Sequence, residues 1–107
     1  MLYKFKSKAA GDLIMLEPNG RRVLEIIGKA PGPKGIIQPA EMEPAAAALE
    51  QAIVREEAEQ QAAVDEAKAR GEVPPTFGEV SLRQRATPFI EMLRRCQAAN
   101  KEVVWGV

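Results

Sequence analysis

Residues 81–96, SLRQRATPFIEMLRRC, carry the clearest helical pattern of the chain. Five apolar residues recur in them at alternating spacings of four and three: Leu82, Ala86, Phe89, Leu93 and Cys96. This spacing places all five on one face of an α-helix. Ser81, followed three residues later by Gln84, forms a capping-box pattern that predicts a helix N-terminus. We therefore expect a helix whose apolar face lies in the core.

A proline interrupts this stripe and leaves the course of the helix open. Pro88 removes a backbone hydrogen bond to the carbonyl of Gln84, which predicts a kink in a helix near 82–99. Alternatively, Thr87 caps a separate helix that starts at Pro88. Both readings keep the apolar face in the core.

A second, longer helix is predicted for residues 44–70, which are rich in alanine and glutamate and contain no helix breaker after Pro44. Its packing stripe lies in the first half and consists of Ala45, Leu49, Ala52 and Ile53. After Val54 the only large apolar residue is Val64. A helix with so weak a stripe cannot bury much of itself on one monomer. Either its end projects into solvent, or its alanine face packs on a partner helix.

Three short segments have the pattern of strands. Aromatic residues alternate with lysines over 2–6, a short apolar run fills 12–16, and the sequence EVVWG occupies 102–106. Strands near both ends with helices between them predict an α+β fold with a sheet of two or three strands. The two terminal strands are candidates for neighbours in that sheet. The whole chain, 1–107, is expected to form one domain.

The segment between the second strand and the long helix is ambiguous. Pro18 and Gly20 suit a type I turn, and the apolar residues that follow have the spacing of a short helix near 20–28, closed by Gly28. The pair Asn19-Gly20 is also a hairpin signal, which leaves a strand over 21–28 as the alternative. Residues 28–39 are expected to form a loop, with Ile36 and Ile37 held against the core.

Composition excludes several kinds of chemistry. The 107 residues include fifteen basic and fifteen acidic ones, so there is no global field to attract nucleic acid or an anionic membrane. There is no histidine, the commonest general base and metal ligand, and Cys96 is the single cysteine. No run approaches the roughly 18 apolar residues of a membrane-spanning helix. We expect a cytoplasmic protein without metal or cofactor.

Three stretches resemble a known family: MLYKFKSKAAGDLIM at the start, RVLEIIGK…PGPKGII in the middle, and SLRQRATPFIEMLRRC…KEVVWGV at the end. The family is an uncharacterised group of short bacterial, chiefly proteobacterial, proteins known as a domain of unknown function. The resemblance covers both ends and much of the middle, and is least distinctive after Val54. It implies a bacterial, stand-alone, single-domain protein. It carries over no catalytic residue.

The candidate binding residues are mostly basic. Loop 28–35 contains Lys29 and Lys34 with several glycines, the ingredients of a phosphate cradle, but no Ser or Thr follows and two prolines remove donors. The arginines of the last helix include Arg83, Arg94 and Arg95. They suit either phosphate contacts or pairing with the acidic long helix, and we favour a solvated or paired face.

Two further residues have a structural and a functional reading. Trp105 could form an aromatic spot for a partner, although a chain with five aromatic residues needs them in its core. Cys96 has arginine neighbours that could activate a thiol, but it lies on the apolar stripe with Phe89. In both cases we expect the core position.

The sequence therefore predicts a non-enzymatic protein-interaction or self-association module. Its partner would be a second copy or another protein, docked through helix 44–70. The alternative is a small nucleic-acid or phosphometabolite binder that uses loop 28–35 and the arginines of helix 82–99. The neutral chain and the lack of interleaved aromatic residues make this the weaker expectation.

Overall fold

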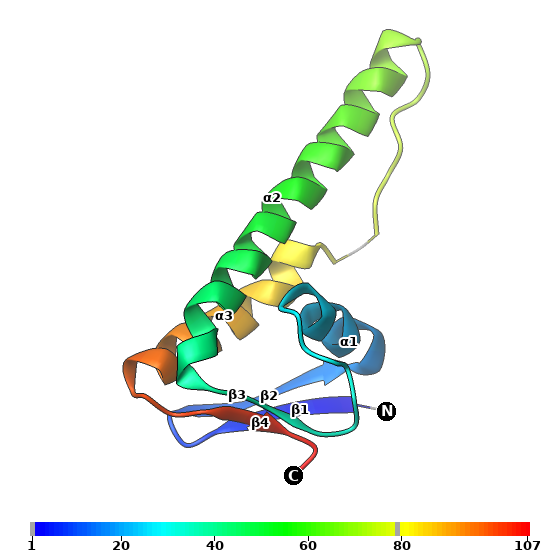
Figure 1. Ribbon diagram of the computed structural model, residues 1–107. Helices are drawn as coiled ribbons and strands as arrows, with labels where there is room; N and C mark the ends of the chain where they lie inside the picture. The colour runs from blue at the N-terminus through cyan, green and yellow to red at the C-terminus, as the bar shows by residue number, and fades with distance from the viewer. Residues whose placement is uncertain (1, 79) are drawn as a thin grey trace.

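The computed structural model describes residues 2–78 and 80–107 and has an α+β fold, which confirms the predicted class. The described elements follow one another as β1 (Leu2–Ser7), β2 (Ala10–Leu16), α1 (Glu17–Ile26), β3 (Gly35–Ile37), α2 (Pro39–Ala69), α3 (Leu82–Ala98) and β4 (Val103–Trp105). The helices lie on one face of the sheet, and α2 projects far beyond it (Figure 1). The molecule is accordingly elongated, 53 × 28 × 22 Å.

The sheet has the strand order β2-β1-β4-β3, and all neighbours are antiparallel. The terminal strands are paired, with Phe5 opposite Trp105, as the sequence suggested. β3 was expected to be loop and instead adds a fourth strand, with Ile36 opposite Val104. A strand of three residues is too short to show a periodicity, so its pairing depends on the tertiary structure.

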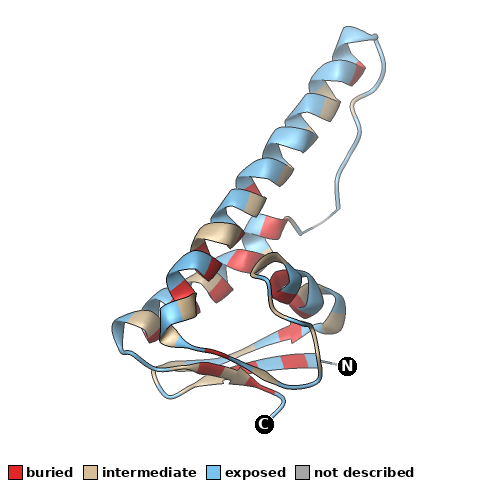
Figure 2. Ribbon diagram, viewed as in Figure 1, coloured by how far each residue is buried: buried red, intermediate tan, exposed pale blue. Residues whose placement is uncertain are grey.

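The core lies between the sheet and the helices (Figure 2). Alternate strand residues point into it, namely Tyr3, Phe5, Met15, Ile37, Val103 and Trp105. The ring of Phe5 packs edge to face on Phe89 of α3 and on Trp105, at centroid distances of 4.8 and 5.9 Å. Aromatic contacts thus join the middle of the sheet to α3.

α1 begins at Glu17, so the turn expected around Pro18–Gly20 is wrong, and so is the alternative hairpin. Pro18 lies in the first helical turn, where its missing N–H costs nothing. Gly20 faces the ring of Tyr3 so closely that a Cβ at this position would collide with it. The expected end is confirmed, because Gly28 has φ 84° and closes the helix.

α2 begins at Pro39 rather than near 44, and Pro44 lies within it. The carboxylate of Glu41 accepts a hydrogen bond from the backbone N–H of Gln38 at 2.8 Å, which caps this earlier start. Beyond Ile53, Ala67 is the one buried residue of the helix among those described. The distal part therefore projects into solvent, with residues 71–78 running back beside it (Figure 1). We call residues 54–78 the arm.

α3 is continuous from Leu82 to Ala98, and all five residues of the predicted stripe are buried. The Ser81–Gln84 capping box is present. Thr87 lies within the helix and donates a hydrogen bond to the carbonyl of Arg83 at 2.5 Å, so a separate helix starting at Pro88 is excluded. Within the described residues, none of the helices combines the length and apolar character needed to cross a bilayer.

Candidate interaction surface

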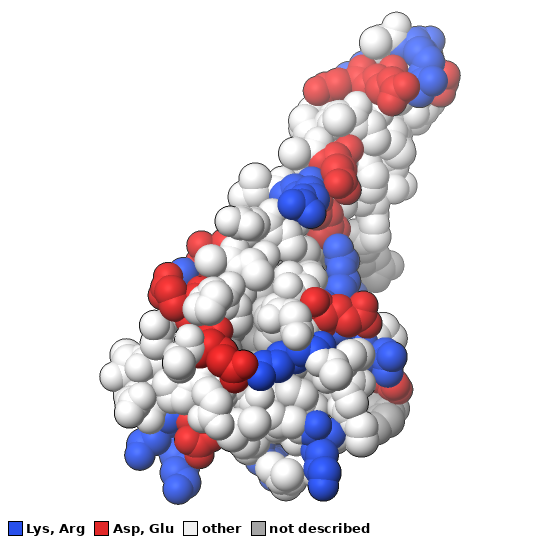
Figure 3. Space-filling model, in the orientation of Figure 1, with Lys and Arg blue, Asp and Glu red and all other residues white. Residues whose placement is uncertain are grey.

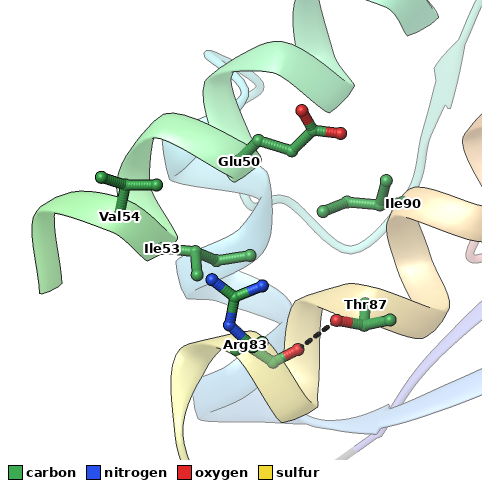
Figure 4. A pocket seen from close by; sticks show the side chains of 6 residues that line it. All are labelled: Glu50, Ile53, Val54, Arg83, Thr87 and Ile90. Carbon is green, nitrogen blue, oxygen red and sulfur yellow. Dashed lines mark hydrogen bonds between the residues drawn. The ribbon is translucent and has the colours of Figure 1, made fainter. Parts of the chain in front are cut away.

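A groove lies between α2 and α3 (Figure 4). It is a hollow of about 360 Å³, lined by Glu50, Ile53, Val54, Arg83, Thr87 and Ile90. Ile53 is buried, whereas the side chain of Val54 is 62% exposed at the mouth of the hollow. The apolar side chains come from both helices and the charged ones stand at the rim. We call this hollow the α2/α3 groove.

The charges at the rim are paired within the molecule. Arg83 donates two hydrogen bonds of 2.8 Å to the carboxylate of Glu57, and Arg94 donates one of 2.5 Å to Glu50. The bond from Arg83 holds the pKa of Glu57 below its ordinary value and raises the pKa of Arg83 itself. The bond to Glu50 raises the pKa of Arg94 in the same way. These exposed pairs connect α2 with α3 and add little stability.

The groove continues along the exposed side of α2, which we call the outer face of α2. Its members recur at spacings of three and four and are mostly small: Ala47, Gln51, Val54, Ala58, Ala62, Asp65 and Ala69. Such spacing is that of the contact seam between two helices, and small side chains allow a close approach. Charged side chains gather in separate patches along the arm, with uncharged surface between them (Figure 3). The outer face of α2 therefore resembles an unpartnered helix seam.

The structure does not gather the candidate basic residues into one patch. Lys29 forms an ion pair of 2.6 Å with Glu41 at the start of α2, and this hydrogen bond lowers the pKa of Glu41, helped by the N–H of Gln38. Lys34 is exposed in the loop before β3. Arg95 lines a different hollow, shared by the start of β2 and α3, whereas Arg83 lines the α2/α3 groove.

The loop that carries these lysines is tied to the sheet by its carbonyl groups. The hydroxyl of Tyr3 donates to the carbonyl of Pro31 at 2.9 Å, and the indole N–H of Trp105 donates to that of Gly32 at 3.2 Å. Trp105 is 2% exposed and Cys96 is fully buried. Both residues therefore occupy the core positions favoured by the sequence, and neither presents a surface to a partner.

The described part of the chain contains no group of three or more Cys, Asp or Glu side chains placed to hold a metal ion. Several of its carboxylates pair instead with arginines and lysines, as in the α2/α3 groove. Sequence reasoning identified Arg83 and Arg94 but missed the importance of Val54 and Ile90. Their role depends on the packing of two helices that are far apart in sequence, and no local signal reports it.

Comparison with known proteins gave one match. A family model described as Domain of unknown function (DUF1840) matches residues 1–105, which include every strand, the α2/α3 groove and the arm. No curated protein and no solved structure matched the chain.

Proposed function

We propose that this chain, which belongs to the DUF1840 family of unknown function, is a non-enzymatic self-association module. The outer face of α2 and the α2/α3 groove of one copy pack on the same surfaces of a second copy. The module works in a bacterial cytoplasm, in keeping with the family resemblance and with the single, buried thiol of Cys96.

The observation that carries the proposal is the exposure of Val54 beside the groove. Val54 is a β-branched apolar residue that is 62% exposed, so covering its side chain lowers the free energy of the complex. In a two-fold dimer with antiparallel α2 helices, the two copies of Val54 lie next to each other near the axis. Each then covers the mouth of a hollow that contains Ile53 and Ile90.

Charge favours a second copy in this antiparallel arrangement. Residues 50–72 contain seven carboxylates and three cations, whereas α3 contains four arginines and one glutamate. Antiparallel packing about Val54 places the acidic arm of one copy beside α3 of the other. Glu50, Glu57, Arg83 and Arg94 are already paired within each copy, so this complementarity orients the two copies without adding these ion pairs across the axis.

The size of the surface is sufficient for a stable dimer. α2 has 31 residues and is therefore about 46 Å long. A strip of that length and one to two helices wide covers roughly 500–900 Å², which is comparable with the ~800 Å² per partner of a standard interface.

The test is the mass of the purified protein in solution, measured by light scattering and sedimentation equilibrium. We expect twice the mass of one chain for the wild type and the mass of a monomer for Val54→Asp. The matched control is Val107→Asp, the same change at a site that is 72% exposed and far from the arm, which should stay dimeric. A wild type that remains monomeric at high concentration, or a Val54→Asp variant that remains dimeric, contradicts the proposal.

A titration with labelled single-stranded DNA and RNA tests the alternative of a nucleic-acid binder. Arg83 and Arg94 are already neutralised by carboxylates, so we expect no binding at physiological salt. Binding that weakens steeply with salt and is lost when Lys29 and Lys34 are replaced would favour the alternative instead.

A further inference from the structure

Among the described residues, none of the helices covers the face of the sheet that points away from the core (Figure 1). Even-numbered strand residues point outward here, since their odd-numbered neighbours form the core. Four aliphatic residues of these strands are exposed: Leu2 (57%), Ile14 (56%), Leu16 (61%) and Ile36 (39%). Lysines stand among them, and Figure 3 shows basic side chains on the lower side of the molecule, below the sheet. We call this surface the outer sheet face.

The register of the sheet arranges these residues in a definite pattern. Leu2 lies opposite Leu16 at one corner, and Ile36 lies opposite Val104 towards the other edge. From the spacing of strands and residues, the two aliphatic pairs are about 16 Å apart on the diagonal. Lys4 and Lys6 follow each other along β1 on the same face, between the two pairs. The outer sheet face thus has the two lysines of β1 between aliphatic residues, with Ile14 of β2 directly opposite Lys4.

The lysines are held at the surface. Lys4 forms an ion pair of 3.4 Å with Asp12, and Lys6 donates to the carbonyl of Val107 at 3.3 Å. Lys6 also borders two shallow hollows. One is about 230 Å³ and reaches Leu2 and Lys4; the other is about 330 Å³ and is lined by Lys8 and Val104 together with the carboxylates of Asp12 and Glu102. Lys4, Lys6 and Lys8 outnumber Asp12 and Glu102, so the face carries a small excess of positive charge that favours an anionic partner.

We propose that the outer sheet face binds an acidic amphipathic helix of a partner protein. A separation of about 16 Å equals about 11 residues of α-helix, so apolar residues at positions i and i+11 of one stripe reach both aliphatic pairs. Acidic residues between them meet Lys4 and Lys6. An antiparallel sheet commonly has one face packed on the core and the other exposed, and the partner helix would cover the exposed aliphatic residues of the second face.

A second copy of the chain does not suit this face. Stacking two outer sheet faces would take Lys6 of both copies out of water without a carboxylate partner, and burying such charges is costly. The inference is therefore independent of the dimer proposed above, which uses the opposite side of the molecule. The Val54→Asp monomer should bind the helix as well as the wild type does.

The probe is a fluorescein-labelled designed peptide of about 18 residues, five helical turns, with leucines on one stripe and glutamates on its flanks. A matched peptide carries lysine in place of glutamate. Fluorescence anisotropy with the full chain should show binding of the acidic peptide alone. The double variant Lys4→Glu/Lys6→Glu should weaken it about ten-fold or more, whereas Arg21→Glu/Arg22→Glu on α1, matched in charge, should change it less than about two-fold.

Ile14→Ser and Leu16→Ser keep the charge and remove exposed aliphatic groups, so the fold should persist while peptide binding weakens. Absence of binding at about 1 mM peptide, equal binding of both peptides, or insensitivity to Lys4→Glu/Lys6→Glu overturns the proposal. Co-sedimentation with phosphatidylcholine–phosphatidylglycerol vesicles tests the alternative anionic partner, a membrane surface. Binding to the vesicles but not to the acidic peptide would assign the face to a membrane and overturn the helix partner.

Discussion

The rings of Phe5 and Phe89 meet edge to face, with centroids 4.8 Å apart and planes at 82°. Phe5 stands on β1, one of the two central strands, and Phe89 lies in the middle of α3, and neither is exposed. Their contact joins two elements that are far apart in sequence. Disrupting this contact therefore tests whether α3 packs on the sheet as described.

Replacing Phe89 with alanine should lower the free energy of unfolding by about 2–5 kcal/mol, because it removes a buried ring and leaves a cavity beside Phe5. Urea titration followed by circular dichroism measures the change. Val73→Ala, at a residue that is 90% exposed, should stay within about 0.5 kcal/mol of the wild type. A loss below about 1 kcal/mol for Phe89→Ala would mean that this face of α3 is not in the core.

Gly35→Ala should destabilise the pairing of β3 with β4. A Cβ at Gly35 would overlap the indole ring of Trp105, which is itself fixed by its hydrogen bond to the carbonyl of Gly32. We expect a loss of about 1–3 kcal/mol, typical of overpacking, and a change in tryptophan fluorescence. The matched control is Gly11→Ala, because the space around Gly11 is open. Equal stability of the two variants would contradict the close approach.

The pair Lys29–Glu41 should make stability depend on pH. The hydrogen bond from Lys29 lowers the pKa of Glu41 below its ordinary value of 4.5 in the folded state. A lowered pKa stabilises the fold above the unfolded pKa, and this contribution is lost as the pH falls through the folded value.

Glu41→Gln should therefore be less stable than the wild type at neutral pH, and the difference should shrink as the pH falls below about 4.5. Denaturant titrations at several pH values measure it. Glu25→Gln, a change at an exposed glutamate of α1, serves as the control for general effects of charge removal. A difference that grows towards acid would show that the sign of this linkage is wrong.

The sequence predicted those parts of the fold in which local pattern and burial coincide. The stripe of α3 repeats over four turns, so its face and its start at Ser81 were both correct. The start of α1 was wrong because Pro18 was assigned to a turn, and the start of α2 was wrong because the helix was taken to begin at Pro44; in both helices a proline, Pro18 or Pro39, lies in the first helical turn. β3 was missed because its pairing is created by a strand some seventy residues later.

The candidate surface was predicted less completely for a similar reason. The acidic character of the long helix and the arginines of the last helix suggested that they pair, and Arg83 with Glu57 confirms it. Val54 and Ile90 carry no such signal, since a groove exists only once two helices are placed side by side. The outer sheet face likewise required the strand order, which brings Ile36 beside Val104.

Removal of the arm should separate folding from association. Residues 54–78 contribute one buried side chain, Ala67, to the described structure, whereas the core cluster lies outside them. The ion pair of 2.8 Å between Glu57 and Arg83 shows that the two ends of the arm lie close together. A short Gly-Ser link in place of 58–78 can therefore join α2 to α3 without strain.

We expect the free energy of unfolding of this deletion variant to lie within about 1 kcal/mol of the wild-type value. Both are measured under dilute conditions in which the wild type is monomeric. The shorter connection also lowers the entropy cost of closing the loop, which favours the variant slightly. At high concentration it should remain a monomer, since it lacks the distal half of the outer face of α2. A variant that fails to fold would place the arm in the core. A folded variant that still dimerises would show that the distal half of α2 is not part of the contact and would contradict the antiparallel packing proposed above.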